Sequence, residues 1–231
     1  MTVATDSSLW GWKISARVYR WTYGPLAHAL DDALFGFLGE DLRGMVVADV
    51  GCGPGVVARK LLAGGAERVF AIDVEADMLR QIGDQPGLVP VRGRAEDDVL
   101  PRIRAEHGID GFDLVLFKRS LYQPTDTARA VLRSAWESLR PGRRLCVVHP
   151  EASLRRYAFG EPLRLRRHTP YHLFNRTASR IGTLIGAEHY TLYSRDGLRT
   201  LLGEVAGPER VVDIPSAQRS FVLVAARRPE R

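Results

Sequence analysis

The fold is decided by residues 46–55, which read Val46-Val47-Ala48-Asp49-Val50-Gly51-Cys52-Gly53-Pro54-Gly55. The first half is an apolar, β-branched run, typical of a strand buried on both faces of a parallel sheet. Three glycines at every second position follow, and residues 56–63 then show the apolar spacing of a helix. A strand, a glycine-rich turn and a helix in this order predict a ligand site at the turn, because glycine lets the backbone approach a ligand closely.

A second strand and the acid after it support this site. Residues 68–72 read as a buried strand, and Asp73 follows directly. An acid in this position can accept both ribose hydroxyl hydrogens of a nucleoside. The glycines are not spaced as in the dinucleotide motif G-x-G-x-x-G, so a dinucleotide-binding domain is the less favoured alternative.

The pattern Asp49-x-Gly51-x-Gly53-x-Gly55 with Asp73 resembles the first motifs of class I S-adenosylmethionine-dependent methyltransferases, and the resemblance covers roughly residues 40–150 and the last strand. It implies an α/β, Rossmann-like fold with a seven-stranded, mostly parallel sheet, one antiparallel strand and helices on both faces. It also implies an N-terminal helical cap and an insertion after the fifth strand. Further strands are expected at 87–91, 112–117, 144–148, 210–214 and 221–226, and helices over 25–38, 126–139 and 195–202.

The chain is expected to have three parts. Residues 1–40 would form a helical cap or lid, residues 41–150 and 195–231 the cofactor-binding core, and residues 151–194 a substrate-covering insertion. The insertion is rich in arginine, which can bind a carboxylate or phosphate with two hydrogen bonds and would then select an anionic substrate. The alternative is that most of these arginines face solvent.

The resemblance implies that S-adenosylmethionine is the cofactor and S-adenosylhomocysteine its product. The glycine loop would hold the methionine end, Asp73 the ribose, and Val74 or Met78 the adenine. Arg94, which cannot accept a hydrogen bond, stands where the family often has an aspartate that accepts one from the adenine amino group. Glu96 or Asp97 would accept it instead, and the backbone N–H of Ala95 would face a ring nitrogen of the adenine. The residues expected to contact the cofactor are Tyr19, Asp49, Gly51, Cys52, Gly53, Gly55, Asp73, Val74, Met78, Ala95, Glu96, Phe117 and Lys118.

Methyl transfer needs an aligned nucleophile and, for a hydroxyl or a protonated amine, a base. His149, after the fifth strand, is the first candidate for the base; the alternative is that it only shapes the floor of the site. His172 in the insertion is a weaker candidate. Tyr122, after the fourth strand, would orient a polar substrate or form a wall. No cysteine–histidine cluster has the spacing of metal ligands, so no metal is expected.

Composition narrows the class of protein. The 231 residues carry a net charge of +6, and of the 33 basic residues only Lys13, Lys60 and Lys118 are lysines. Such an arginine bias can follow codon usage, so the charge is weak support for a nucleic-acid partner. No apolar run approaches ~18 residues, so no membrane span is expected. With no pattern of a signal peptide and two unpaired cysteines, Cys52 and Cys146, the protein is expected in the cytoplasm.

The sequence therefore favours a methyltransferase that acts on a small molecule, with O-methylation ahead of N-methylation. The strand at 112–117 is not followed by the acid-Pro-Pro-aromatic motif of enzymes that methylate exocyclic amines of bases. Two alternatives stay open: a nucleic-acid methyltransferase that uses the arginine-rich insertion, and a protein of this fold that binds the cofactor without methyl transfer. The sequence does not set the oligomeric state.

Overall fold

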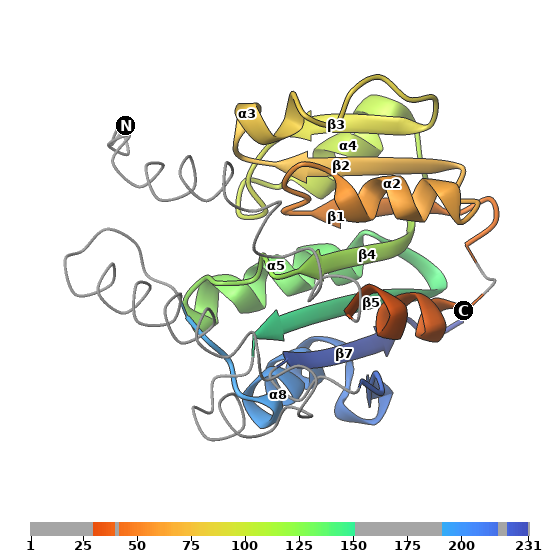
Figure 1. Cartoon of the computed structure of the whole chain (residues 1–231). Helices are drawn as coiled ribbons and strands as arrows, with labels where there is room; N and C mark the ends of the chain where they lie inside the picture. Colours follow the sequence, from red (N-terminus) through yellow and green to blue (C-terminus); the bar gives the residue numbers. More distant parts are fainter. Residues whose placement is uncertain (1–29, 40–41, 151–190, 217–220, 231) are drawn as a thin grey trace, which may run out of the picture.

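The computed structural model describes residues 30–39, 42–150, 191–216 and 221–230, which build one seven-stranded sheet (Figure 1). The strand order is β3-β2-β1-β4-β5-β7-β6. The first five strands run parallel, and β7 runs antiparallel between β5 and the short β6. This confirms the predicted sheet with one antiparallel strand. The strands are β1 (Val46–Val50), β2 (Arg68–Asp73), β3 (Leu88–Arg92), β4 (Phe112–Lys118), β5 (Leu139–Pro150), β6 (Val211–Asp213) and β7 (Phe221–Arg227).

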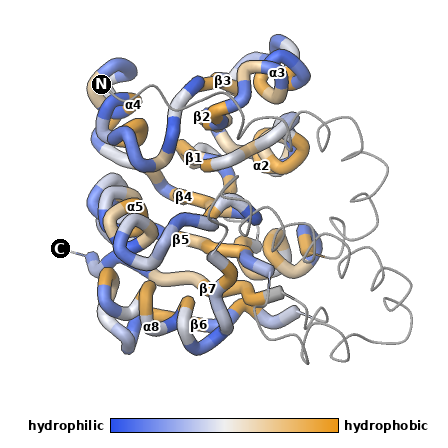
Figure 2. Tube along the Cα trace, turned by 90° about the vertical axis from the view of Figure 1, so that its left-hand side faces the viewer, coloured by the Kyte–Doolittle hydropathy of each residue, from blue (hydrophilic) through white to orange (hydrophobic). Residues whose placement is uncertain are grey.

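Helices cover both faces of the sheet, so the described part of the chain has three layers (Figure 2). One layer holds α2 and the helical residues 30–38, and the other holds α4, α5 and α8. The helices are α2 (Val56–Ala63), α3 (Ala76–Leu79), α4 (Val99–His107), α5 (Thr125–Glu137) and α8 (Arg195–Ala206), with a short 3-10 helix η3 (Pro208–Arg210). None of the helices in these ranges is long and apolar enough to cross a membrane.

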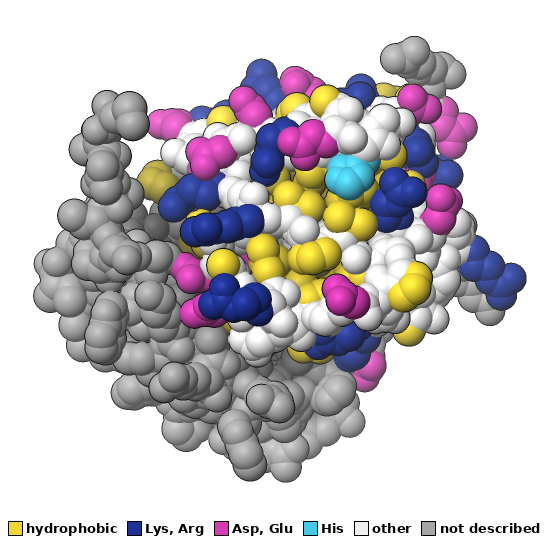
Figure 3. All heavy atoms as spheres, turned by 90° about the horizontal axis from the view of Figure 1, so that it is seen from above, with side chains coloured by type: hydrophobic (Ala, Val, Ile, Leu, Met, Phe, Trp, Pro, Cys, Tyr) yellow, Lys and Arg dark blue, Asp and Glu magenta, His cyan; other side chains and the backbone are white. Residues whose placement is uncertain are grey.

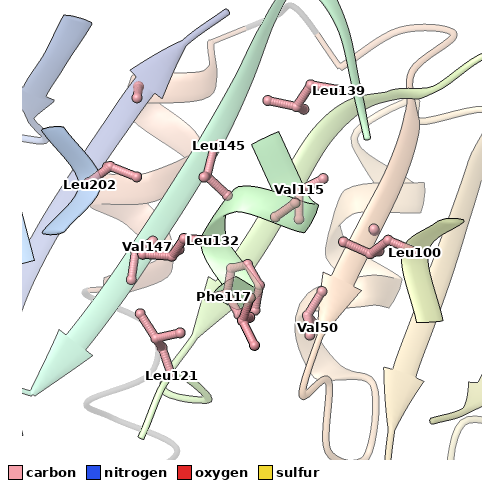
Figure 4. Close-up of a cluster of buried hydrophobic side chains, with 14 of the residues drawn as sticks. Val50, Leu100, Val115, Phe117, Leu121, Leu132, Leu139, Leu145, Val147 and Leu202 are labelled. Carbon is pink, nitrogen blue, oxygen red and sulfur yellow. The ribbon is translucent and has the colours of Figure 1, made fainter. Parts of the chain in front are cut away.

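The strands separate two hydrophobic cores because successive side chains point to opposite faces. On β4, Val115 and Phe117 pack toward α4, α5 and α8, whereas Leu114 and Leu116 pack toward α2 and residues 30–38. In Figure 4, Phe117 lies between Val50 of β1 and Val147 of β5. The side chains on both faces of the central strands are therefore buried, as the apolar run of β1 predicted.

The structure contains one helix that was not expected, and several boundaries differ from the expectation. Helix α4 was not expected, although Val99, Leu100 and Ile103 have helical spacing and are buried. Strand β5 begins at Leu139, five residues early, because Leu139 pairs with Phe112 across a register shift. Helix α5 accordingly ends at Glu137. Of the expected helix over 25–38, residues 30–38 are described. The rest of the expected cap and most of the insertion lie outside the described residues.

Strand β3 forms one edge of the sheet, and the face above it carries hydrophobic side chains among charged ones (Figure 3). An edge strand offers free backbone groups to other strands. Pro90 of β3 lies opposite Ala71 of β2 and is exposed. Because proline has no backbone N–H group, this position of the edge strand cannot donate a hydrogen bond to another strand.

Candidate functional site

The carboxyl ends of β1, β2, β4 and β5 meet at one edge of the sheet, which faces the viewer in Figure 2. In an open α/β sheet, ligands bind along this edge. The residues predicted from the sequence as functional come mainly from the loops that leave it. The geometry of these loops decides which of them can contact a ligand together.

The glycine loop turns sharply and is fixed to β2. The backbone N–H groups of Gly51 and Cys52 both donate to the carbonyl of Ile72, at 2.8 and 2.9 Å. Gly51 has a φ of 73°, and a Cβ atom there would lie 2.2 Å from the Cβ of Ser120. Glycine is therefore required at position 51, because the loop after β4 packs directly against it.

Gly53 differs from its neighbour because its open side faces no protein atom. Its φ is 54°, and nothing lies within 4 Å of the position that a Cβ would take. Its N–H group donates to Oδ2 of Asp73 at 2.8 Å, so the loop is tied to the acid that follows β2. A ligand can approach the backbone here without meeting a side chain.

Asp73 is held by two backbone donors and retains further acceptor capacity. Its Oδ1 atom accepts from the N–H of Glu75 at 2.9 Å, while Oδ2 accepts from Gly53. Burial raises the pKa of Asp73, and these backbone bonds partly offset the rise. Each carboxylate oxygen has a second lone pair, so the side chain can accept two hydroxyl donors in addition.

Asp49, the last residue but one of strand β1, is buried and has one carboxylate oxygen without a hydrogen-bond partner among the described residues. It is 1% exposed, and this oxygen is Oδ2. Burial raises the pKa of Asp49 to about 7, with the charge of Lys118 acting in the opposite direction. A buried carboxylate with an unpaired oxygen beside the glycine loop suits a ligand cation.

A cluster of charges lies behind this acid. Asp31, in the helical residues 30–38, is 1% exposed and pairs through Oδ2 with Lys60 of α2 at 2.5 Å. Its Oδ1 atom pairs with Lys118 at the end of β4. Burial lowers the pKa of Lys118, whereas the ion pair with Asp31 raises it. Two of the three lysines of the chain therefore share one buried aspartate.

The loop after β4 connects this cluster to the neighbouring strands. Arg119 has a φ of 61°, unusual for a residue with a side chain, and its N–H donates to the carbonyl of Val148 at 2.7 Å. The hydroxyl of Ser120 donates to the carbonyl of Val50. Strands β1, β4 and β5 are thus bound together at the edge where the site lies.

The end of β5 holds a cluster of rings. His149 is fully buried, and its ring centroid lies 5.3 Å from that of Tyr122 and 5.3 Å from that of Tyr193. The N–H of Tyr193 donates to Nε2 of His149 at 3.1 Å. The Tyr193 hydroxyl donates to the carbonyl of Gln123 at 2.6 Å. Tyr122 and His149, both predicted as catalytic, therefore lie side by side.

The other residues predicted to contact the cofactor differ in how far their side chains are exposed. Val74 and Ala95 are half-buried, Met78 is buried and Glu96 is exposed. The ring of Phe117 is completely buried in the core (Figure 4), so it presents no side-chain surface to a ligand.

Burial raises the pKa of the Cys52 thiol, which donates to the carbonyl of Gly53. Such a thiol stays protonated at neutral pH and fills the turn rather than reacting.

Two predicted residues, Tyr19 and His172, lie outside the described part of the chain. The sequence analysis missed Asp31, Lys60, Ser120 and Tyr193. Asp31 could have been noticed, because it shares a helical face with Leu30 and Leu34, where an acid is unusual. Ser120 and Tyr193 carry no such signal, since their partners lie about 70 and 44 residues away in sequence.

Two further features bear on the extent of the site. A small cavity lined by Leu38, Met45 and Arg144 lies at the amino ends of the strands, opposite the glycine loop. It is therefore not part of this site. Within the described ranges, no group of three or more His, Cys, Asp or Glu side chains could hold a metal ion.

Residues 47–142 match the family model of a methyltransferase domain. The chain is also similar to several solved structures. The DhpI complex with SAH is 18% identical, with a TM-score of 0.66 and coverage of 98% of this chain and 97% of that chain. Two more of these structures are an O-methyltransferase family protein from Burkholderia thailandensis and the N-methyltransferase NodS from Bradyrhizobium japonicum WM9.

The Burkholderia protein is 15% identical, with a TM-score of 0.64 and coverage of 94% of this chain, which spans only 60% of that protein. NodS is 16% identical, with a TM-score of 0.57 and coverage of 90% and 98%. At such low identity these likenesses show the fold. No curated protein matches the chain.

Proposed function

We propose that the chain is a class I S-adenosylmethionine-dependent methyltransferase that transfers the methyl group to a small molecule, at oxygen rather than nitrogen. When bound, the cofactor supplies an electrophilic methyl group on a sulfonium. The protein must then hold the cofactor, orient the acceptor atom and exclude competing water.

The geometry of the glycine loop fits the cofactor. Gly53 leaves its outer side open, and the loop N–H groups and Asp73 are already fixed in place. The free lone pairs of Asp73 would accept the two ribose hydroxyls. The unpaired Oδ2 of Asp49 would accept from the ammonium group at the methionine end.

The adenine would lie beyond β2, against Val74 and Met78. Val74 follows Asp73 directly, and Met78 is on the first turn after it. On the neighbouring loop, Ala95 would contribute its backbone and Glu96 its exposed carboxylate. Gly51, Cys52 and Gly55 would shape the loop without donating side-chain contacts, and Tyr19 would cover the cofactor from residues 1–40.

Lys118 would act through charge rather than as a direct ligand. It forms an ion pair with Asp31, and its positive charge also favours the ionised form of Asp49. Without it, Asp49 would be still harder to ionise in its buried position. Lys118 would therefore maintain Asp49 in a state that can receive a cation.

The acceptor would bind where β4 and β5 end, between Tyr122, His149 and the insertion at 151–194. Residues 1–40 would close the site, and residues 41–150 and 195–231 would form the core. The arginines of the insertion, with His172 among them, favour an anionic substrate. The similar structures include both an O-methyltransferase family protein and an N-methyltransferase, so the choice of oxygen rests on the sequence analysis.

The observation that carries this proposal is the hydrogen bond between Gly53 and Asp73 beside an open glycine face. The first experiment is calorimetric titration of the purified chain with S-adenosylmethionine and S-adenosylhomocysteine, together with the Asp73→Ala variant. Binding to the wild type that the variant loses would support the site and justify a substrate screen with labelled methyl groups. No binding to the wild type at millimolar concentration would refute the proposal.

A further inference from the structure

The buried histidine at the end of β5 has one partner where it could have two. Nε2 of His149 accepts from the N–H of Tyr193 at 3.1 Å. Nδ1 is also buried and has no hydrogen-bond partner in the described part of the chain. The side chain as a whole is 0% exposed.

These contacts determine the tautomer. A backbone N–H can only donate, so Nε2 must keep its lone pair. A neutral imidazole has one N–H, which must then be on Nδ1. Burial lowers the pKa of His149 to about 3, because it disfavours the charged ring. At neutral pH the side chain is thus a neutral donor, and the nitrogen that could take up a proton is already occupied.

We propose that the Nδ1–H group of His149 donates a hydrogen bond to an oxygen of the methyl-accepting substrate, and that His149 is a positioning residue rather than the general base. This inference rests on the proposed function and narrows it. A buried donor without a partner is rare, because its desolvation is not repaid. A substrate oxygen that reaches Nδ1 removes that penalty and is held in a fixed place.

A second unpartnered atom indicates the chemistry of the substrate. Oε1 of Gln123 is buried and has no partner among the described residues. Tyr193 holds both sides of this cluster, because its N–H binds His149 and its hydroxyl binds the carbonyl of Gln123. One free donor and one free acceptor near the same tyrosine suit a small molecule with a carbonyl oxygen and an O–H or N–H group.

The tautomer can be measured without any substrate. The full chain is labelled with ¹⁵N-histidine, and long-range ¹H–¹⁵N spectra are recorded with and without S-adenosylhomocysteine. The signal of His149 is assigned by its absence in the His149→Gln variant. We expect a protonated Nδ1, an unprotonated Nε2 and no titration near neutral pH. A protonated Nε2, or a ring that titrates near neutrality, would overturn the proposal.

Two substitutions separate the roles of the two nitrogens. In His149→Gln the side-chain oxygen can reach the place of Nε2 and keep the bond from Tyr193, but the donor at Nδ1 is lost. In His149→Asn the side-chain amide nitrogen can take the place of Nδ1, but the bond from Tyr193 is lost. Thermal unfolding and S-adenosylhomocysteine titration of both variants show whether fold and cofactor site persist.

The acceptor probes are 2-hydroxybenzamide and phenol, which differ by a carbonyl group next to the hydroxyl, assayed with labelled S-adenosylmethionine. We expect the wild type to prefer the amide by at least about tenfold, because a site built for a hydrogen bond rejects an analogue that lacks it. His149→Gln should lose this preference through KM, with an unchanged pH profile, and His149→Asn should keep part of it.

The other outcomes are decisive. If His149→Gln retains the preference for the amide, the proposed hydrogen bond from Nδ1 of His149 is contradicted. It is also contradicted if the wild type binds S-adenosylhomocysteine but transfers no methyl group to either probe. Equal loss of kcat in both variants, with loss of the acidic limb of the pH profile, identifies a base instead. Failure to bind S-adenosylhomocysteine would refute the proposed function, and the spectra would still decide the tautomer.

Discussion

The backbone N–H of Gly53 donates to Oδ2 of Asp73 at 2.8 Å, which joins two residues 20 positions apart in sequence. The bond connects the loop after β1 to the end of β2. The acid therefore has two roles in the proposed cofactor site: it fixes the glycine loop, and its remaining lone pairs can accept hydrogen bonds from a ligand. Asp73 can perform both roles while its hydrogen bond to Gly53 stays in place.

The variant Asp73→Ala should bind S-adenosylhomocysteine at least about 100-fold more weakly, because each hydrogen bond to a charged acceptor contributes about 1.5–3 kcal/mol. Calorimetric titration measures the loss. Asp84→Ala is the matched control, since Asp84 is an exposed acid outside the glycine loop. Equal affinity in wild type and Asp73→Ala would remove Asp73 from the site.

The variant Gly53→Ala tests the open face of the loop. The new Cβ would meet no protein atom, yet it would occupy the space assigned to the cofactor. The positive φ costs about 1–2 kcal/mol of stability for a residue with a Cβ. We expect a folded protein that has lost cofactor binding in calorimetric titration.

Gly83→Ala is the control for backbone strain. Gly83 has a φ of 73° and, like Gly53, nothing within 4 Å of the Cβ position. The two variants should lose similar stability in urea unfolding, and only Gly53→Ala should lose binding. Comparable binding by both would indicate that the cofactor does not lie against Gly53.

The strands β1 and β2 and the glycine loop between them could be predicted because they depend on local patterns. The apolar run of β1, the three glycines and Asp73 follow one another in the chain, and their chemistry is legible from residue type. The ion pair of Asp31 with Lys118 joins residues 87 positions apart, and only the folded chain reveals it. The same holds for the bond from Tyr193 that sets the tautomer of His149.

The buried charges of Asp31 and Lys118 should be strongly coupled. Asp31→Asn leaves Lys118, whose side chain is 9% exposed, without its ion-pair partner. Removing one member of a buried pair typically costs about 3–5 kcal/mol. Urea unfolding should show a loss of this order.

Asp32→Asn is the control, because Asp32 is the exposed neighbour on the same helical turn. The double variant Asp31→Asn/Lys118→Met should recover part of the lost stability, by about 0.5–3 kcal/mol relative to the sum of the single changes. Strict additivity of the two changes would indicate that the ion pair does not contribute to stability in solution.

The pH dependence of cofactor binding should reflect Asp49. Burial raises its pKa to about 7, so the carboxyl is largely neutral in mildly acidic solution. A neutral carboxyl binds the cofactor ammonium poorly, and the affinity should fall by up to about tenfold for each pH unit below 7. Calorimetry between about pH 5.5 and pH 8 measures the slope.

The raised pKa of Asp49 also affects folding stability, and there its pH dependence is opposite to that of cofactor binding. An unfolded aspartate ionises near 3.8, whereas the folded Asp49 ionises near 7, so the folded state holds one more proton between these values. Raising the pH through this window therefore lowers the contribution of Asp49 to stability while it strengthens binding. The variant Asp49→Asn should bind the cofactor weakly at every pH. It should also lack the contribution of Asp49 to the pH dependence of both binding and stability. If Asp49→Asn kept the wild-type pH dependence of binding, another group would have to carry it.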